Sequence, residues 1–210
     1  MQYHYSGKRF FAFLITLMAI ASCASSPPPR SGFLADYSNL KPDRYGNSHL
    51  LWWEKPDFDW KRYRRLMLDP IVVVYHPAAK NQEIRPDDLK RLTDEFRDTV
   101  LSELQGNFPV VDTPGPDVLR VRAAITEIIP ANPALNVLTT AVAFVPLDMG
   151  GAAIEAEFID SSTNEVMAAM VERKLGTPLD FQSGFTSLGH ARASFKLWAA
   201  ELKQALETGP

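Results

Sequence analysis

The sequence predicts an α+β domain: a single mixed, mostly antiparallel sheet of about four or five strands with two long amphipathic helices packed on one face. Two observations support this class. In the segments 86–106 and 188–209, apolar side chains recur every three or four residues, which is typical of helices with one buried side. Elsewhere, β-branched runs and alternating apolar and polar residues are typical of strands. One sheet that carries both helices on one face buries these side chains most economically.

The composition is that of a globular chain. Of the 210 residues, 46% are hydrophobic and 22% are charged, which excludes a chain disordered throughout. The formal net charge of -3 argues against nucleic acid as a partner. A single cysteine excludes an intramolecular disulfide framework and a cysteine-based zinc cluster.

Residues 1–22 are predicted to be a lipoprotein signal peptide. Lys8 and Arg9 precede a twelve-residue, almost wholly apolar run, which is too short to span a bilayer as a helix. The end of this run, Ser22 followed by Cys23, resembles the lipobox of bacterial lipoproteins, in which the chain is cut before the cysteine and the thiol is lipidated. The alternative, that Cys23 is only a small apolar residue, does not explain its place between such a run and a proline-rich linker.

Cleavage before Cys23 leaves a lipidated tether, 23–32, and a periplasmic α+β domain, 33–210. The tether contains three consecutive prolines, and its ten steps span at most ~35 Å. The membrane is therefore a partner through the lipid on Cys23, and the domain stays close to it. Residue 24 is alanine, and not the aspartate that resembles an inner-membrane retention signal in enteric bacteria. We therefore expect the outer membrane, at its periplasmic face.

The elements of the domain follow in order. The β-branched run 71–75 is typical of a buried central strand, and Pro86 with two aspartates suits the start of the first helix. After that helix, we expect a short edge strand at 108–111 and a half-buried strand at 119–126. Two further alternating segments, separated by Asp160-Ser161-Ser162-Thr163-Asn164, predict a hairpin before the last helix.

The segment 33–40 precedes the first of these elements. Phe33, Leu34, Tyr37 and Leu40 have the spacing of one side of a short helix, and we expect them to fasten the tether to the domain. A partner-binding surface is the alternative.

The irregular segment 45–69 contains Trp52, Trp53 and Trp60. As an exposed row, these rings would stack on sugars of the cell wall. Burial at one end of the sheet is the favoured interpretation, because large aromatic side chains are usually buried.

The segment 128–147 has twenty residues and no charged side chain. Its prolines exclude a plain transmembrane helix. It is either a buried crossover on the sheet or an exposed contact surface for the bilayer, a sister subunit or another envelope protein. Leu135, Val137 and Phe144 are the candidate contact residues, and the two alternatives are evenly matched.

The sequence shows no pattern that we can assign to an enzyme. After cleavage the chain keeps three histidines, and none of its serines lies in a Gly-x-Ser-x-Gly motif. No metal site or cofactor is predicted. Glu155 and Glu157 share one strand face, and we expect them to form a solvated charge ladder with Arg120 and Arg122.

Several segments together resemble an uncharacterised lipoprotein family of Gram-negative bacteria, domain-of-unknown-function family 3313. The most specific is the opening Ser31-Gly32-Phe33-Leu34, followed by Asp36-Tyr37-Ser38 and Leu40. Later landmarks are Tyr63 before Asp69-Pro70, Asp160-Ser161-x-Thr163 in the hairpin turn, and Trp198-Ala199. Asn164 stands where the family tends to have glycine, but asparagine also tolerates the left-handed conformation of a turn. The resemblance implies an envelope lipoprotein and no reaction.

These observations predict a lipid-anchored envelope protein that serves as a non-catalytic scaffold or accessory binding protein. Its partner would be another envelope protein or a second copy of itself. Cell-wall glycan binding through the three tryptophans is the second interpretation. A hydrolase without a recognisable motif is the third.

Overall fold

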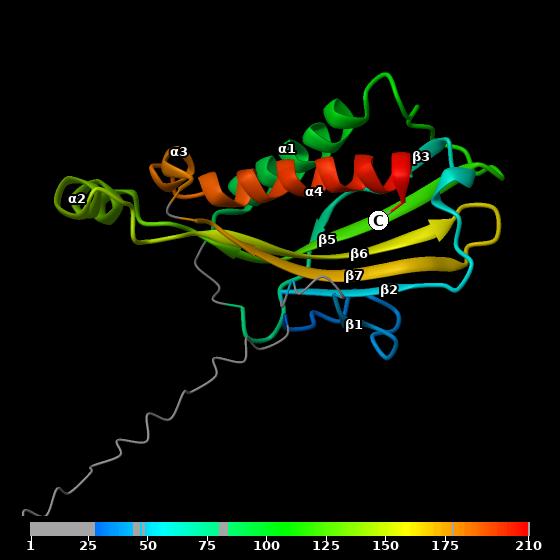
Figure 1. Cartoon of the computed structure of the whole chain (residues 1–210), viewed down its shortest axis with the longest axis horizontal. Coiled ribbons are helices and arrows are strands. Elements are labelled where there is room, and N and C mark those ends of the chain that lie inside the picture. The colour runs from blue at the N-terminus through cyan, green and yellow to red at the C-terminus, as the bar shows by residue number, and fades with distance from the viewer. Residues whose placement is uncertain (1–27, 44–46, 48, 80–83, 178, 210) are drawn as a thin grey trace, which may run out of the picture.

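The computed structural model describes residues 28–43, 47, 49–79, 84–177 and 179–209, and these residues form an α+β fold on one open mixed sheet (Figure 1). The expected signal peptide and lipidation site, including Ser22 and Cys23, lie outside the described residues. The elements in chain order are β1 (Lys41–Pro42), β2 (Leu50–Glu54), the 3-10 helix η1 (Trp60–Arg62), β3 (Arg65–Leu68), β4 (Val72–Val73), α1 (Pro86–Leu104), β5 (Val118–Ile129), α2 (Pro133–Ala143), β6 (Gly151–Asp160), β7 (Val166–Leu175), α3 (Phe181–Gly184) and α4 (Gly189–Thr208).

Both long helices form where they are expected and pack on the same face of the sheet (Figure 1). Pro86 opens α1 at a position where its missing N–H is not needed, and Gly209, with φ of 84°, ends α4. Phe96 of α1 stacks on Phe195 of α4 with the ring centroids 4.4 Å apart. This contact joins the two helices within the main core.

The sheet has seven strands in the described part of the chain, more than the four or five expected. The strand order is β1-β2-β7-β6-β5-β3, with β4 also paired to β5, and only β3 and β4 run parallel to their neighbour. The additional strands β1, β2 and β3 come mostly from the segment expected to be irregular. The hairpin of β6 and β7 is confirmed, and Asn164 in its turn has φ of 59°.

Two strand predictions are wrong in their extent. The run 71–75 is not a central strand, because only Val72 and Val73 pair, and they pair with β5 alone. β3 and β4 lie one after the other along the same edge of β5, so β4 faces solvent and Val72 is exposed. The expected edge strand at 108–111 is reduced to one bridge between Leu66 and Val110.

The N-terminal segment covers the second face of the sheet, opposite the helices (Figure 1). Leu34 is buried there against Leu51, Ala169 and Val171 in a small core of its own, with Phe33, Tyr37, Leu40 and Trp53 packed around it. The segment consists of turns and bends rather than the expected helix, because its contacts are with the sheet. Its expected role as a fastening between tether and domain agrees with this packing.

The N-terminal segment also overturns the expected solvated charge ladder. Glu155 and Glu157 are 0% and 2% exposed. Glu155 accepts hydrogen bonds from the Ser31 amide (2.6 Å) and the Tyr37 hydroxyl (2.5 Å). Glu157 accepts one from the Ala35 amide at 2.9 Å and pairs with Arg122 at 2.6 Å. Both carboxylates therefore fasten the segment to β6.

Tyr63 makes the stability of the folded domain depend on pH in the alkaline range. Its buried hydroxyl donates to Asp160 Oδ2 at 2.9 Å. Burial, followed by the hydrogen bond to the Asp160 carboxylate, raises the pKa of Tyr63. The unfolded chain loses this proton near pH 10 and the folded chain keeps it, so stability from this group is complete below pH ~10 and falls as the pH rises further.

We therefore expect the free energy of unfolding of Tyr63→Phe to fall less steeply than that of the wild type above pH ~10. At neutral pH the variant should be less stable by about 1–3 kcal/mol, because Asp160 loses a buried donor. Urea denaturation between pH 7 and 11 measures both effects, and equal slopes of the free energy of unfolding against pH for the two proteins would contradict the assignment.

Candidate functional site

A cavity of about 920 Å³ lies between the sheet and the two long helices. Its walls on the sheet side include Trp52, Ile154, Ala156 and Met170, and its walls on the helix side include Phe96, Trp198 and Leu202. Most of these side chains belong to the main core. The cavity is therefore an opening in the core, lined largely by carbon, rather than a depression in the polar surface.

The tryptophans do not form the exposed row that a glycan-binding platform requires. Trp60 is 3% exposed and stacks against Trp52, with the ring centroids 6.1 Å apart. Successive residues of a strand point to opposite faces, so Trp53 packs in the small core on the other side of the sheet. Trp60 is buried as expected and Trp52 is partly buried against the main core, and both also line the cavity.

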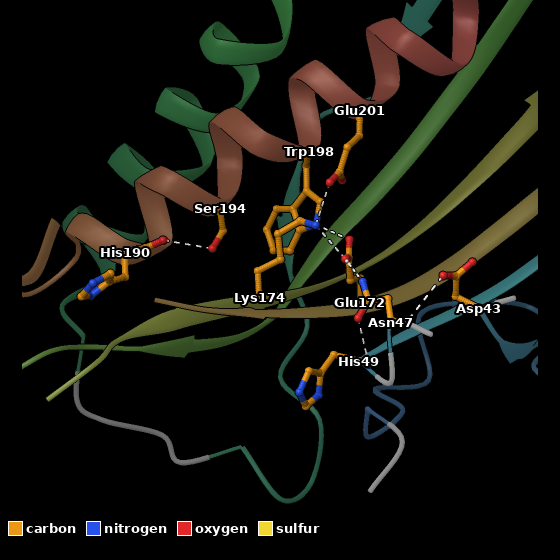
Figure 2. A network of polar contacts seen from close by, with 9 residues as sticks. All are labelled: Asp43, Asn47, His49, Glu172, Lys174, His190, Ser194, Trp198 and Glu201. Carbon is orange, nitrogen blue, oxygen red and sulfur yellow. Dashed lines mark hydrogen bonds and ion pairs between the residues drawn. The ribbon is translucent and has the colours of Figure 1, made fainter. Parts of the chain in front are cut away.

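A polar network lies along the cavity where β7 passes beneath α4 (Figure 2). The buried carboxylate of Glu172 accepts hydrogen bonds from the Trp198 indole (2.7 Å), the Lys174 ammonium (2.7 Å) and the side-chain amide of Asn47 (3.0 Å). Lys174 also contacts Glu201 at 2.9 Å. The network ties α4 to β7 on one side of the cavity.

Lys174 keeps its charge in this network. Burial by itself would lower the pKa of Lys174, but the hydrogen bonds and charges of Glu172 and Glu201 outweigh burial, and the pKa is raised. Both oxygens of Glu172 are occupied by protein donors. A ligand in the cavity therefore meets apolar walls and, at Glu172, a carboxylate that protein donors already occupy.

The described residues contain no group of three or more histidine, cysteine, aspartate or glutamate side chains that could hold a metal ion. His190 and Ser194 are close on α4, but the serine hydroxyl donates to the backbone carbonyl of His190 at 3.0 Å and not to its ring (Figure 2). The His190 ring accepts a hydrogen bond from the Gly150 amide at 3.1 Å. This arrangement does not activate the serine as a nucleophile.

Of the uncharged segment 128–147, the first two residues end β5, and residues 130–147 form an arm that projects past the end of the sheet, between β5 and β6 (Figure 1). The arm contains α2, which the sequence analysis did not predict. Pro133 at the first helical turn and Asn132, whose side chain caps the helix, are the sequence signals that could have revealed it. No helix in the described part of the chain is long and apolar enough to cross a membrane.

Hydrogen bonds hold the arm in a defined conformation. Asn136 is 0% exposed, donates to the carbonyls of Asp148 and Gly184 at 2.8 Å, and accepts from the Asp148 amide at 2.8 Å. The Asp148 carboxylate accepts from the Asn132 amide at 2.5 Å. The inner side of the arm is thus polar, and its Asn136 side chain is fully hydrogen-bonded.

The outer side of the arm is apolar and exposed. Val142 and Phe144 are 74% and 80% exposed, and Leu135, Val137, Leu138 and Leu147 are exposed as well. Of the two alternatives for this segment, the structure thus favours the exposed surface over the buried crossover. The three residues expected to make contacts, Leu135, Val137 and Phe144, all lie on this surface.

Comparison with known proteins places the chain in a family. Residues 29–202 match the family model described as Protein of unknown function (DUF3313). The chain belongs to this family. It is also 30% identical over 190 residues to the Uncharacterized lipoprotein YdcL of Escherichia coli (strain K12), which covers 82% of this chain and 84% of that protein. The family resemblance read from the opening segment is thus confirmed.

Solved structures with some likeness to the chain are more distant. The PelC dodecamer from Paraburkholderia phytofirmans has 11% identity and a TM-score of 0.41, covering 72% of this chain and 96% of that one. The hypothetical protein CT253 from Chlamydia trachomatis has 12% identity and a TM-score of 0.44, and the match covers 70% of this chain and 99% of that one.

Proposed function

We propose that the protein is an accessory binding lipoprotein, anchored through Cys23 in the outer membrane and facing the periplasm, whose domain binds the apolar part of a single-chain amphiphile. It acts by binding and not by catalysis. A further envelope protein or a second copy of the chain remains an expected partner.

The observation that carries this proposal is the cavity. Protein interiors are close-packed, with few voids larger than a water molecule, whereas ligand pockets enclose about 300–1,000 Å³. A cavity of about 920 Å³ falls in the second class. Its walls include Trp52, Phe158 and Met170, which match hydrocarbon better than a sugar or a phosphate.

The polar residues among the cavity lining suit the head group of such a ligand. Lys41 and Lys55 on the sheet side and Glu201 and Gln204 on α4 all belong to the lining. An amphiphile can therefore bury its chain against the core while its head group meets charged and hydrogen-bonding side chains.

A bulky side chain inside the cavity should remove binding. Leu202 lines the cavity from α4, and we expect Leu202→Trp to fill part of it and weaken binding at least tenfold. The chain from Ala24 onward, without lipid, is titrated with hexadecanoic acid that carries a pyrene group, and unlabelled hexadecanoic acid is the competitor.

Leu197→Trp is the matched control. Leu197 lies on the same helix, is exposed and does not line the cavity. This control should bind the fatty acid like the wild type, and both variants should keep the wild-type unfolding midpoint within a few degrees. Equal affinity of Leu202→Trp and the wild type would exclude the cavity as the binding site.

A further inference from the structure

We propose that the outer side of the α2 arm inserts into the surface of the lipid bilayer to which the protein is anchored, as a second membrane contact beside the lipid. The arm is not part of the cavity, so this inference is independent of ligand binding there.

The orientation of α2 is the first argument. Successive residues of an α-helix are ~100° apart, so Leu135, Leu138 and Val142 share one face, and Asn136 and Thr140 lie roughly opposite. In a surface helix of a soluble protein, the apolar face normally packs on the core. Here the polar face packs inward through Asn136, and the apolar face is left to solvent.

The absence of charge is the second argument. The segment 128–147 contains no aspartate, glutamate, lysine or arginine, whereas 22% of the whole chain is charged. Protein-binding surfaces commonly carry a polar, charged rim, while the apolar part of a bilayer excludes charged side chains. An uncharged and convex element fits a lipid surface better than it fits a protein groove.

The size of the arm is the third argument. The eleven residues of α2 form a helix of only ~16 Å, which is too short to span a bilayer and is suited to lie in its interface. The exposed side chains of Phe144 and Leu147 continue the apolar surface beyond its end.

The position of the tether is the fourth argument, and it rests on lipidation at Cys23. Ser31 is held at Glu155 of β6, and the eight steps from Cys23 to Ser31 span at most ~29 Å. Glu155 lies four residues from Gly151, where β6 meets the arm, which is ~13 Å along the strand. The tether is therefore long enough for the anchor point and the arm to meet the same membrane surface.

Vesicle binding by the chain from Ala24 onward tests the arm without the lipid. All of the packing described above lies within residues 28–209, so this chain retains the folded domain. We expect it to sediment with phosphatidylcholine vesicles, and Leu138→Glu combined with Val142→Glu should weaken this binding at least tenfold. Leu197→Glu combined with Val72→Glu, which adds the same charges at two exposed apolar side chains away from the arm, should bind like the wild type.

The uncharged arm makes a further distinction possible. Binding through basic residues depends on anionic lipid and salt, whereas binding through this arm should be similar on phosphatidylcholine and phosphatidylglycerol vesicles and insensitive to salt. Strong dependence on anionic lipid would overturn the proposal.

A direct readout is available because the chain from Ala24 onward contains no cysteine. An environment-sensitive dye on Val142→Cys should shift to the blue when vesicles are added, and the same dye on Leu197→Cys should not. If Val142→Cys shows no shift, or if the arm variant abolishes a dimer of the wild type while vesicle binding persists, the membrane is not the occupant of this surface.

Discussion

Replacing Cys23 with alanine is expected to abolish fatty-acid incorporation and to remove the protein from the outer membrane. The variant has no thiol to which lipid can be attached. Each methylene of an acyl chain buried in the bilayer contributes about 0.8 kcal/mol, so several chains hold a protein far more firmly than a short apolar arm can. Metabolic labelling with an alkyne fatty acid, followed by separation of inner and outer membranes, measures both effects.

Two substitutions of Ala24, the residue next to Cys23, complete this experiment. Ala24→Ser changes the residue beside the lipidation site without introducing the charge of an aspartate, and it should fractionate like the wild type. Ala24→Asp should move the labelled protein to the inner membrane in an enteric host. If Cys23→Ala were labelled or remained in the outer membrane at the wild-type level, the anchor would be refuted, and with it the membrane argument for the arm.

The elements that the sequence predicts correctly are those whose apolar pattern and boundary residues lie in one continuous stretch of chain. The helices α1 and α4 each combine a repeated apolar side with a clear boundary, Pro86 in one and Gly209 in the other. The hairpin of β6 and β7 has two alternating segments and a turn with Asn164. In these cases, one stretch of chain contains both the pattern and its end signals.

The missed strands depend on partners far away in the chain. β3 is only four residues long and becomes a strand by pairing in parallel with residues 118–121. The adjacent Trp52 and Trp53 could not be assigned to opposite faces until the pairing of β2 with β7 was known. The cavity has walls from β2, β6, β7, α1 and α4, so no local pattern marks it.

The surroundings of Glu155 were predicted wrongly for the same reason. Alternation along β6 correctly placed Glu155 and Glu157 on the face away from the helices. Nothing within β6 shows that a segment more than 100 residues earlier covers that face. The arm is an intermediate case, because its apolar and uncharged character was evident, but its exposure depends on how Asn136 binds the loop around Asp148.

Loss of the Glu155 carboxylate should release the start of the N-terminal segment from the sheet. Glu155→Leu leaves the Ser31 amide and the Tyr37 hydroxyl without this acceptor at a buried site. Hydrogen bonds to a charged group contribute about 1.5–3 kcal/mol each, so we expect the free energy of unfolding to fall by about 3 kcal/mol after the added apolar burial is allowed for. Urea denaturation gives this value.

Amide hydrogen exchange locates the effect. The amide of Ser31 should lose protection in Glu155→Leu, while the amide of Ala35, which donates to Glu157, and amides of β6 and β7 near the turn should keep it. Glu165→Leu is the matched control, because Glu165 is exposed in that turn and pairs only with Lys55 among the described contacts of its carboxylate. The free energy of unfolding of Glu165→Leu should fall by less than about 1 kcal/mol. Equal losses in the two variants would show that Glu155 is not the fastening.

Glu155→Leu also tests whether the contacts at Glu155 affect how the arm meets the membrane. While Ser31 is held at Glu155, only eight steps separate the domain from Cys23, whereas release up to Ala35, which Glu157 still holds, lengthens this connection to twelve steps, or at most ~43 Å. The effective concentration of the arm at the bilayer falls as a flexible connection grows longer. In the lipidated protein on vesicles, a dye on Val142→Cys should therefore shift less to the blue when Glu155→Leu is also present, although the protein stays anchored. An unchanged shift would mean that the lipid and the arm reach the membrane independently of the fastening at Glu155.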